Sequence, residues 1–132
     1  MNIDRIKELY LEKDFNCAEA TLMAVNEEYS LGLDDNSIKL LGAFGGGMGC
    51  GKVCGALAAG VAAIGRMKIE ERAHATAFLK EQLTEYVSMF EKENGSVDCV
   101  DVKARNFIEG QRCLKTVLDN AEMLDAFIKK IS

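Results

Sequence analysis

The sequence predicts an all-α fold, a compact bundle of about five to six helices with a glycine-rich loop. Apolar residues recur with a period near 3.6 along most of the chain. No segment shows the sustained alternation with period two that is typical of strands. Proline, which breaks helices, is absent. The 132 residues are expected to form a single domain, residues 1–132.

Two helices are predicted near the N-terminus. The apolar face of the first is formed by Ile3, Ile6, Leu9 and Tyr10. The second is expected to start at Cys17, because Asn16 is a good N-cap and Glu19 completes a capping box. Residues 30–37 break the helical pattern, and residues 38–44 fit either a short helix or a strand.

Nine of the twelve glycines lie between residues 42 and 65. Each glycine weakens a helix interior by about 1 kcal/mol, so the glycines before Cys50 predict a tight turn. This turn should lead into a helix at Gly51. The small residues from Gly55 to Gly65 predict a shallow helix face that another backbone can approach closely.

Two further amphipathic helices are predicted in the second half of the chain. Residues 69–92 predict a long helix that stops at Asn94-Gly95 and carries His74, the only histidine, on its surface. Its apolar positions are Ala73, Ala77, Phe78, Leu83, Tyr86, Val87 and Phe90. The stripe of the terminal helix comprises Leu114, Val117, Leu118, Ala121, Leu124, Phe127, Ile128 and Ile131.

Composition and charge narrow the choice of partners. A net charge of -5 with dispersed lysines and arginines lacks the electrostatic footprint of a nucleic-acid-binding protein. The longest uncharged run, residues 53–65, is shorter than the roughly 20 residues of a membrane-spanning helix. The first residues are rich in charge and do not resemble a signal peptide, so we expect a cytoplasmic protein. Neither nucleic acid nor membrane is an expected partner.

The glycine-rich stretch also approaches the pattern of a phosphate-binding loop. Gly46, Gly51 and Lys52 reproduce the spacing G-x-x-x-x-G-K. Val53, however, stands where that motif needs Ser or Thr for the magnesium ion, and no recurring strands are predicted to build the required sheet. The dinucleotide pattern G-x-G-x-x-G does not occur in this stretch. We therefore expect no nucleotide.

The five cysteines carry the strongest indication of chemistry. Four of them fall at or near predicted helix starts, namely Cys17, Cys54, Cys99 and Cys113. Exposed N–H groups and the helix dipole stabilise thiolates there, and the thiolate is the form that binds metals and attacks disulfides. Cys50 lies four residues before Cys54, close enough on a helix for a shared metal or redox event. No C-x-x-C pair of the zinc-ribbon type occurs, and cysteines that merely pack as small apolar residues remain an alternative.

The chain resembles the redox-active family named for its cysteine pattern, C_GCAxxG_C_C. The matching pieces are "FNCAEATLMAV", "GAFGGGMG" followed by "CGALAAG", "GSVDC" and "CLKTVLDNAEML". The resemblance spans nearly the whole chain and implies an all-helical fold with four family cysteines, Cys17, Cys54, Cys99 and Cys113. Cys50 is an addition to the pattern, the segment from Cys99 to Cys113 is shorter than usual, and Val100 stands where an arginine is expected.

The resemblance implies a redox role, and the residues leave three hypotheses open, two of them redox functions. In the first, Cys17, Cys54, Cys99 and Cys113, with Cys50 as a substitute, bind an iron–sulfur cluster of the two-iron form for electron transfer. The glycine turn would supply N–H groups to this cofactor from Gly45, Gly46, Gly47 and Gly49. The second is a thiol–disulfide oxidoreductase or sensor, in which Cys54 attacks and Cys17 is among the resolving partners. The third is an interaction module whose cysteines only pack.

Two kinds of partner are expected under these hypotheses. An electron-transfer role requires a redox protein partner. The small-residue helix face could also serve a homodimer. Whether the chain is itself an oxidoreductase-like enzyme is left open by its residues.

Overall fold

The computed structural model describes residues 1–132 as seven α-helices without a strand. The predicted all-α class is confirmed, whereas the expected number of about five to six helices was too low. The helices are α1 (Ile3–Lys7), α2 (Cys17–Tyr29), α3 (Asp35–Gly42), α4 (Gly55–Lys68), α5 (Leu79–Asn94), α6 (Cys99–Asn106) and α7 (Leu114–Ile131). None of them combines the length and apolar character that a membrane crossing requires.

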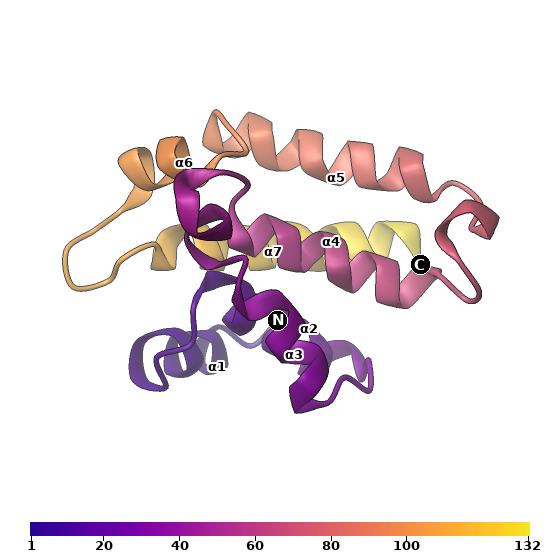
Figure 1. Ribbon diagram of the computed structural model, residues 1–132, viewed down its shortest axis with the longest axis horizontal. Coiled ribbons are helices and arrows are strands. Elements are labelled where there is room, and N and C mark those ends of the chain that lie inside the picture. Colours follow the sequence, from indigo (N-terminus) through magenta and orange to yellow (C-terminus); the bar gives the residue numbers. More distant parts are fainter.

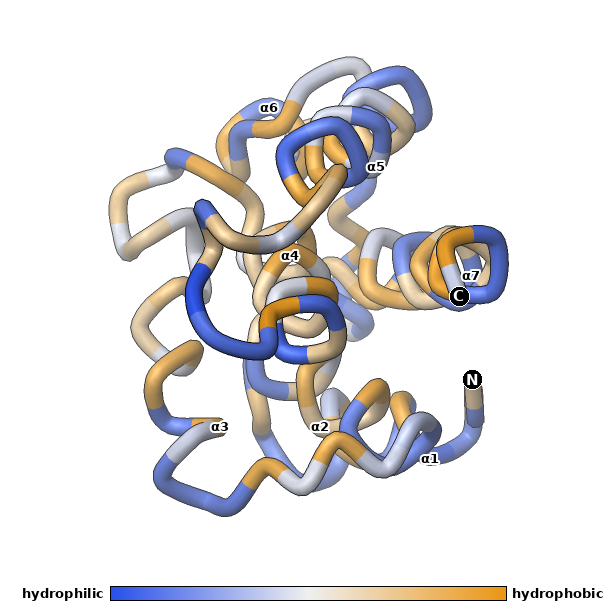
Figure 2. Tube along the Cα trace, turned by 90° about the vertical axis from the view of Figure 1, so that its right-hand side faces the viewer, coloured by the Kyte–Doolittle hydropathy of each residue, from blue (hydrophilic) through white to orange (hydrophobic).

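Helix α4 forms the centre of the molecule. Viewed roughly along its axis, it is surrounded by α2, α3, α5 and α7 (Figure 2). In Figure 1, α4 and α7 run in the same direction, and α5 returns antiparallel to them. The buried residues of α4 are mostly small, which lets the neighbouring helices approach closely: Gly55, Ala56, Leu57, Ala59, Gly60, Ala63 and Ile64.

Gly60 shows how the small residues of α4 are used. A Cβ atom at this position would collide with the hydroxyl group of Tyr86 from α5. That hydroxyl donates a hydrogen bond of 2.6 Å to Asn120 Oδ1 on α7, and Asn120 Nδ2 donates to the carbonyl of Ala56 at 3.0 Å. The shallow face predicted for this helix therefore packs inside the chain. It lends no support to the expected homodimer.

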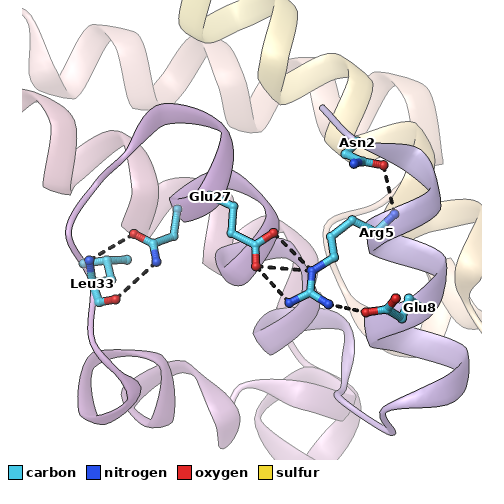
Figure 3. Close-up of polar contacts among 6 residues, drawn as sticks. Asn2, Arg5, Glu8, Glu27 and Leu33 are labelled. Carbon is cyan, nitrogen blue, oxygen red and sulfur yellow. Dashed lines mark hydrogen bonds and ion pairs between the residues drawn. The ribbon is translucent and has the colours of Figure 1, made fainter.

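The N-terminal segment packs on α2 and α7. Helix α1 continues into a π-helical turn, Glu8–Glu12, which buries both Leu9 and Tyr10. A second, smaller core joins this segment to α2 and α7 and comprises Ile6, Leu9, Tyr10, Ala20, Ala24, Leu114, Val117 and Ala121. On the outside, the Arg5 guanidinium contacts Glu27 of α2 at 3.0 Å and also pairs with Glu8 (Figure 3).

The long helix predicted over residues 69–92 begins only at Leu79. Phe78, expected on its buried face, has a left-handed backbone and is 73% exposed. Ahead of it lies a single 3₁₀ turn, Ala73–Ala75, on which His74 is exposed. The reason is topological, since the chain must reverse direction after α4 to bring α5 back along it. The predicted stop is confirmed, because Gly95 ends α5 with φ +78°.

The structure also decides two predictions around the glycine turn, which comprises residues 45–51. Residues 38–44 are helical rather than extended over most of their length and belong to α3, whose N-cap Asp34 accepts the Ser37 N–H at 2.8 Å. The helix expected to begin at Gly51 begins instead at Gly55. Gly51 has φ +76° and Lys52 has ψ -144°, and neither conformation continues into a helix.

Candidate functional site

Four cysteines stand at the starts of four helices. Cys17 and Cys99 are the first residues of α2 and α6, and Cys54 and Cys113 are the N-cap residues of α4 and α7. In Figure 1, α4 and α7 both start at the left of the view, beside α6. The first N–H groups of a helix have no partner within the helix. At this end of the molecule they bond to acceptors elsewhere in the chain or interact with the cysteine sulfurs.

Cys17 is fixed by a capping box and by a glycine. The Asn16 side chain accepts the Glu19 N–H at 3.0 Å, and the Glu19 carboxylate accepts the Asn16 N–H at 3.1 Å, which confirms the predicted cap. The Cys17 sulfur lies against the start of α4. A Cβ atom on Gly55 would stand 2.7 Å from it, so only glycine leaves room for this sulfur.

Cys54 and Cys99 are joined through the backbone. Val53 and Asp98 form an isolated antiparallel bridge. The Cys54 N–H donates to the Val97 carbonyl at 2.8 Å, and the Cys99 N–H donates to the Lys52 carbonyl at 2.5 Å. Two hydrogen bonds thus hold the start of α6 beside the segment that leads into α4.

Cys113 is held by residues that we did not predict as part of a site. Its N–H donates to the hydroxyl oxygen of Tyr10 at 3.1 Å. The Arg112 guanidinium lies 4.2 Å from the centre of the Tyr10 ring and also donates to the Tyr10 carbonyl. The sequence placed Tyr10 on a core face, and only the position of Arg112 next to Cys113 hinted at a role for either residue.

The four thiols are close enough to interact electrostatically. Burial raises the pKa of Cys17, and the nearby charge of Cys99 raises it further. Burial raises the pKa of Cys54 to about 11, with additional contributions from Cys17 and Cys99. The pKa of Cys113 is also raised, first by burial and then by the charges of the same two cysteines. Cys17 and Cys99 therefore lie near both of the other thiols.

Backbone N–H groups oppose this effect at two of the sulfurs. The N–H groups of Gly46, Ala18 and Ala56 interact with the Cys17 sulfur and lower its pKa against the larger effect of burial. Those of Leu57 and Ala56 do the same for Cys54. The donors come from the first turns of α2 and α4 and from the glycine turn, and they favour negative charge on sulfur.

The glycines expected to contact a cofactor have different surroundings. Gly45 leaves room for the Asn16 side chain, and Gly46, at φ +67°, directs its N–H toward Cys17. Gly47, at φ +66°, packs against Cys99, whose Cβ would lie 2.6 Å from an added Cβ atom. Gly49 has φ +70° and no atom within 4 Å of an added Cβ.

Cys50 lies apart in this arrangement. It is exposed on the glycine turn, where its φ of -142° is not helical, and its thiol donates weakly to the Gly47 carbonyl at 3.7 Å. The helical spacing assumed for Cys50 and Cys54 is therefore wrong. The cysteine charges that act on Cys17, Cys54 and Cys113 are those of Cys17 and Cys99.

The donor set is made of free thiols. All five cysteines are unpaired. No three Cys, His, Asp or Glu side chains gather at the spacing of a site for one metal ion. The arrangement thus offers four free thiols, of which Cys17 and Cys99 act electrostatically on the others, with backbone donors directed at two of the sulfurs.

Comparison with known proteins assigns the family. No curated protein and no solved structure matches the chain. Residues 15–127, most of the chain, match the family model described as "Putative redox-active protein (C_GCAxxG_C_C)". The four cysteines at helix starts all lie within the matched residues, and the chain belongs to the C_GCAxxG_C_C family of redox-active proteins.

Proposed function

We propose that Cys17, Cys54, Cys99 and Cys113 bind one iron–sulfur cluster of the two-iron form and that the protein transfers electrons. One observation carries the proposal: four cysteines distant in sequence occupy the starts of four helices, and the charges of Cys17 and Cys99 act on the other thiols. Cysteine thiolates are the usual protein ligands of such clusters.

The chemistry of the donor set fits this group. Four free thiols equal the number of protein ligands that a two-iron cluster takes, two on each iron. A cluster of this form needs pairs of thiols rather than three or four around one point, so it is compatible with the absence of a three-ligand group. When bound, the cluster supplies a one-electron couple.

The electrostatics of the site favour a cation between the thiols. Burial disfavours the thiolate forms of Cys17, Cys54 and Cys113, and a second thiolate nearby disfavours each further. The positive charge of iron would reverse both effects, because a coordinating thiol is deprotonated. The N–H groups of Gly46 and Ala56 would then stabilise the charge that remains on sulfur.

The same surroundings argue against Cys54 as an attacking thiol. A thiol attacks disulfides best when its pKa is near the ambient pH. Burial raises the pKa of Cys54 to about 11, which keeps it protonated at neutral pH. Thiol–disulfide exchange led by Cys54 is therefore the less favoured of the two redox hypotheses.

An electron-transfer role also needs a redox protein partner. Met48 is 50% exposed on the glycine turn, and Val100 is 61% exposed on α6, one residue after Cys99. Apolar side chains this close to the cysteines would suit a partner that docks over them. We infer that the partner approaches this end of the molecule.

The proposal is tested by anaerobic reconstitution with ferrous iron and sulfide, followed by visible spectroscopy. We expect charge-transfer bands that bleach on addition of dithionite. The bands should be lost in Cys54→Ser and kept in the matched control Cys50→Ser. A colourless wild-type protein that cycles between dithiol and disulfide would replace the cluster with the thiol–disulfide function. Thiols that react only after unfolding, with no metal bound, would leave the cysteines as packing residues.

A further inference from the structure

Tyr10 lies outside the residues matched by the family model, yet it reaches the cysteine site. It belongs to the π-helical turn that follows α1 and is only 4% exposed. Its ring is part of the smaller core that joins the N-terminal segment to α2 and α7. Turns of this kind recur at functional sites, where they redirect a side chain.

The hydroxyl group of Tyr10 accepts a hydrogen bond but donates none within the protein. Its oxygen accepts the N–H of Cys113 at 3.1 Å, whereas its own hydrogen has no acceptor in the protein. A buried hydroxyl normally both donates and accepts. An unpaired donor directly beside the start of α7 therefore needs an acceptor that the polypeptide does not provide.

The hydroxyl group of Tyr10 lies beside Cys113, whose N–H it accepts at 3.1 Å. Burial raises the pKa of Tyr10, and negative charges on Cys113 and Cys17 raise it further, so the hydroxyl is within electrostatic reach of both thiols. Backbone hydrogen bonding from Cys113 and the charge of Arg112 act in the opposite direction.

Two interactions with Arg112 hold Tyr10 in this position. Its guanidinium covers the ring at 4.2 Å and donates to the Tyr10 carbonyl. Arg112 itself has φ +54°, in the left-handed region that residues other than glycine seldom adopt. A stacked cation and a backbone hydrogen bond together restrict the ring, and through it the hydroxyl.

We propose that Tyr10 is a positioning residue of the cysteine site: its oxygen fixes Cys113 at the start of α7, and its O–H hydrogen bonds to sulfur held between the cysteines. The second half rests on the proposed function, because the acceptor is a sulfur atom of the loaded site. The N-terminal segment thereby contributes Tyr10 to the lining of the site.

The first half is tested on the reduced, metal-free protein with Tyr10→Phe, which keeps the ring and removes the hydroxyl. Losing the acceptor of the Cys113 N–H should accelerate alkylation of Cys113 by iodoacetamide about three- to tenfold, the effect of one hydrogen bond. The matched control is Tyr29→Phe, at the far end of α2 from Cys17, where the hydroxyl bonds Asp125. Equal rates in both variants would overturn this role. Should Tyr10→Phe fail to fold, amide hydrogen exchange of the wild-type chain provides a second test. The Cys113 N–H should be protected by its hydrogen bond to Tyr10, and exchange as fast as that of an unbonded amide would overturn this role.

The second half is tested by the midpoint potential of the loaded protein. Loss of a hydrogen bond to sulfur should make Tyr10→Phe harder to reduce, by about tenfold in the equilibrium or about 59 mV for one electron. Tyr29→Phe should match the wild type. A loaded Tyr10→Phe with an unchanged potential overturns the hydrogen bond to sulfur and leaves the cluster intact. A wild type that takes up no iron overturns the proposed function and this hydrogen bond together, and the alkylation rates then decide the positioning role alone.

Discussion

Gly47 and Gly55 are positions where any side chain would collide with a cysteine. The Cys17 sulfur lies 2.7 Å from the position that a Cβ atom on Gly55 would take, and Cys99 packs against Gly47. The sequence motif that places glycine directly after Cys54 thus has a steric cause. At the scale of single residues, the site depends on these close approaches as much as on the thiols.

Comparing Gly47→Ala with Gly49→Ala should show how much stability depends on the close packing at Gly47 and how much on its left-handed backbone. At Gly47 the new Cβ would lie 2.5 Å from the Lys52 backbone and 2.6 Å from Cys99, in addition to adopting φ +66°. The control Gly49→Ala carries the same left-handed strain, at φ +70°, in open space. Urea unfolding should show a cost of about 1–2 kcal/mol for Gly49→Ala and about 1–3 kcal/mol more for Gly47→Ala. Equal costs would mean that contact with Cys99 and Lys52 is unimportant.

The buried thiol of Cys54 should make the reduced, metal-free protein less stable in alkali. Its pKa is about 11 in the folded chain against 9.0 ordinarily, so the folded state keeps a proton that the unfolded state loses. The free energy of unfolding is then unaffected below about pH 9 and falls by about 2–3 kcal/mol as the pH rises past 11. Urea unfolding from pH 8 to 11 should show a shallower fall in Cys54→Ser, which has no thiol to titrate. Parallel curves would contradict the burial of this thiol.

At the scale of elements, the central helix α4 contacts both the cysteine site and the buried hydrogen bonds between α5 and α7. Its first turn lies against Cys17, and Gly60 in its middle leaves space for the Tyr86 hydroxyl, which donates to Asn120. Asn120 in turn donates to the Ala56 carbonyl in the first turn of α4. Packing of α5 and α7 is therefore coupled to the position of the helix start that carries Cys54.

Gly60→Ala should disrupt this coupling, and Gly65→Ala should not. An added methyl group at Gly60 collides with the fully buried Tyr86, whereas at Gly65 it would meet only Ile69 at 3.7 Å, an ordinary contact. We expect Gly60→Ala to cost about 1–3 kcal/mol or more in thermal or urea unfolding. Gly65→Ala should be neutral or stabilise by up to about 1 kcal/mol, because alanine favours the helix. A Gly60→Ala variant as stable as the wild type would show that the Tyr86 side chain can move aside without cost.

The elements also show what could be predicted from the sequence. The capped start of α2 and the apolar stripe of α7 depend on neighbouring residues alone, and both were predicted correctly. The start of α5 was not, because the reversal after α4 is imposed by packing of α5 along α4 rather than by the residues at 69–78. Helical periodicity continued through Phe78, which the turn leaves in solvent.

At the scale of the whole molecule, the placement of cysteines at helix starts could be predicted, and their surroundings could not. Local capping signals marked the start at Cys17, and the glycine turn marked the neighbourhood of Cys54. The bridge between Val53 and Asp98 and the contact of Tyr10 with Cys113 join residues far apart in the chain. Such pairings have no local signal, so Tyr10 was assigned only to the core.

The bundle as a whole brings the starts of α2, α4, α6 and α7 to one end of the molecule, where we propose the shared site. Each helix contributes one cysteine at its start. A redox group at this end would therefore be held by four separate elements, and its loading should stabilise the whole fold.

Native mass spectrometry of the anaerobically loaded protein, followed by alkylation and peptide mapping, tests this shared site most directly. We predict a mass gain of about two iron and two sulfide per chain. Alkylation should then label Cys50 alone, with Cys17, Cys54, Cys99 and Cys113 protected until the iron is chelated. A chain that gains no mass, or one in which Cys50 is protected while any of the other four is labelled, would contradict a cluster held at the four helix starts.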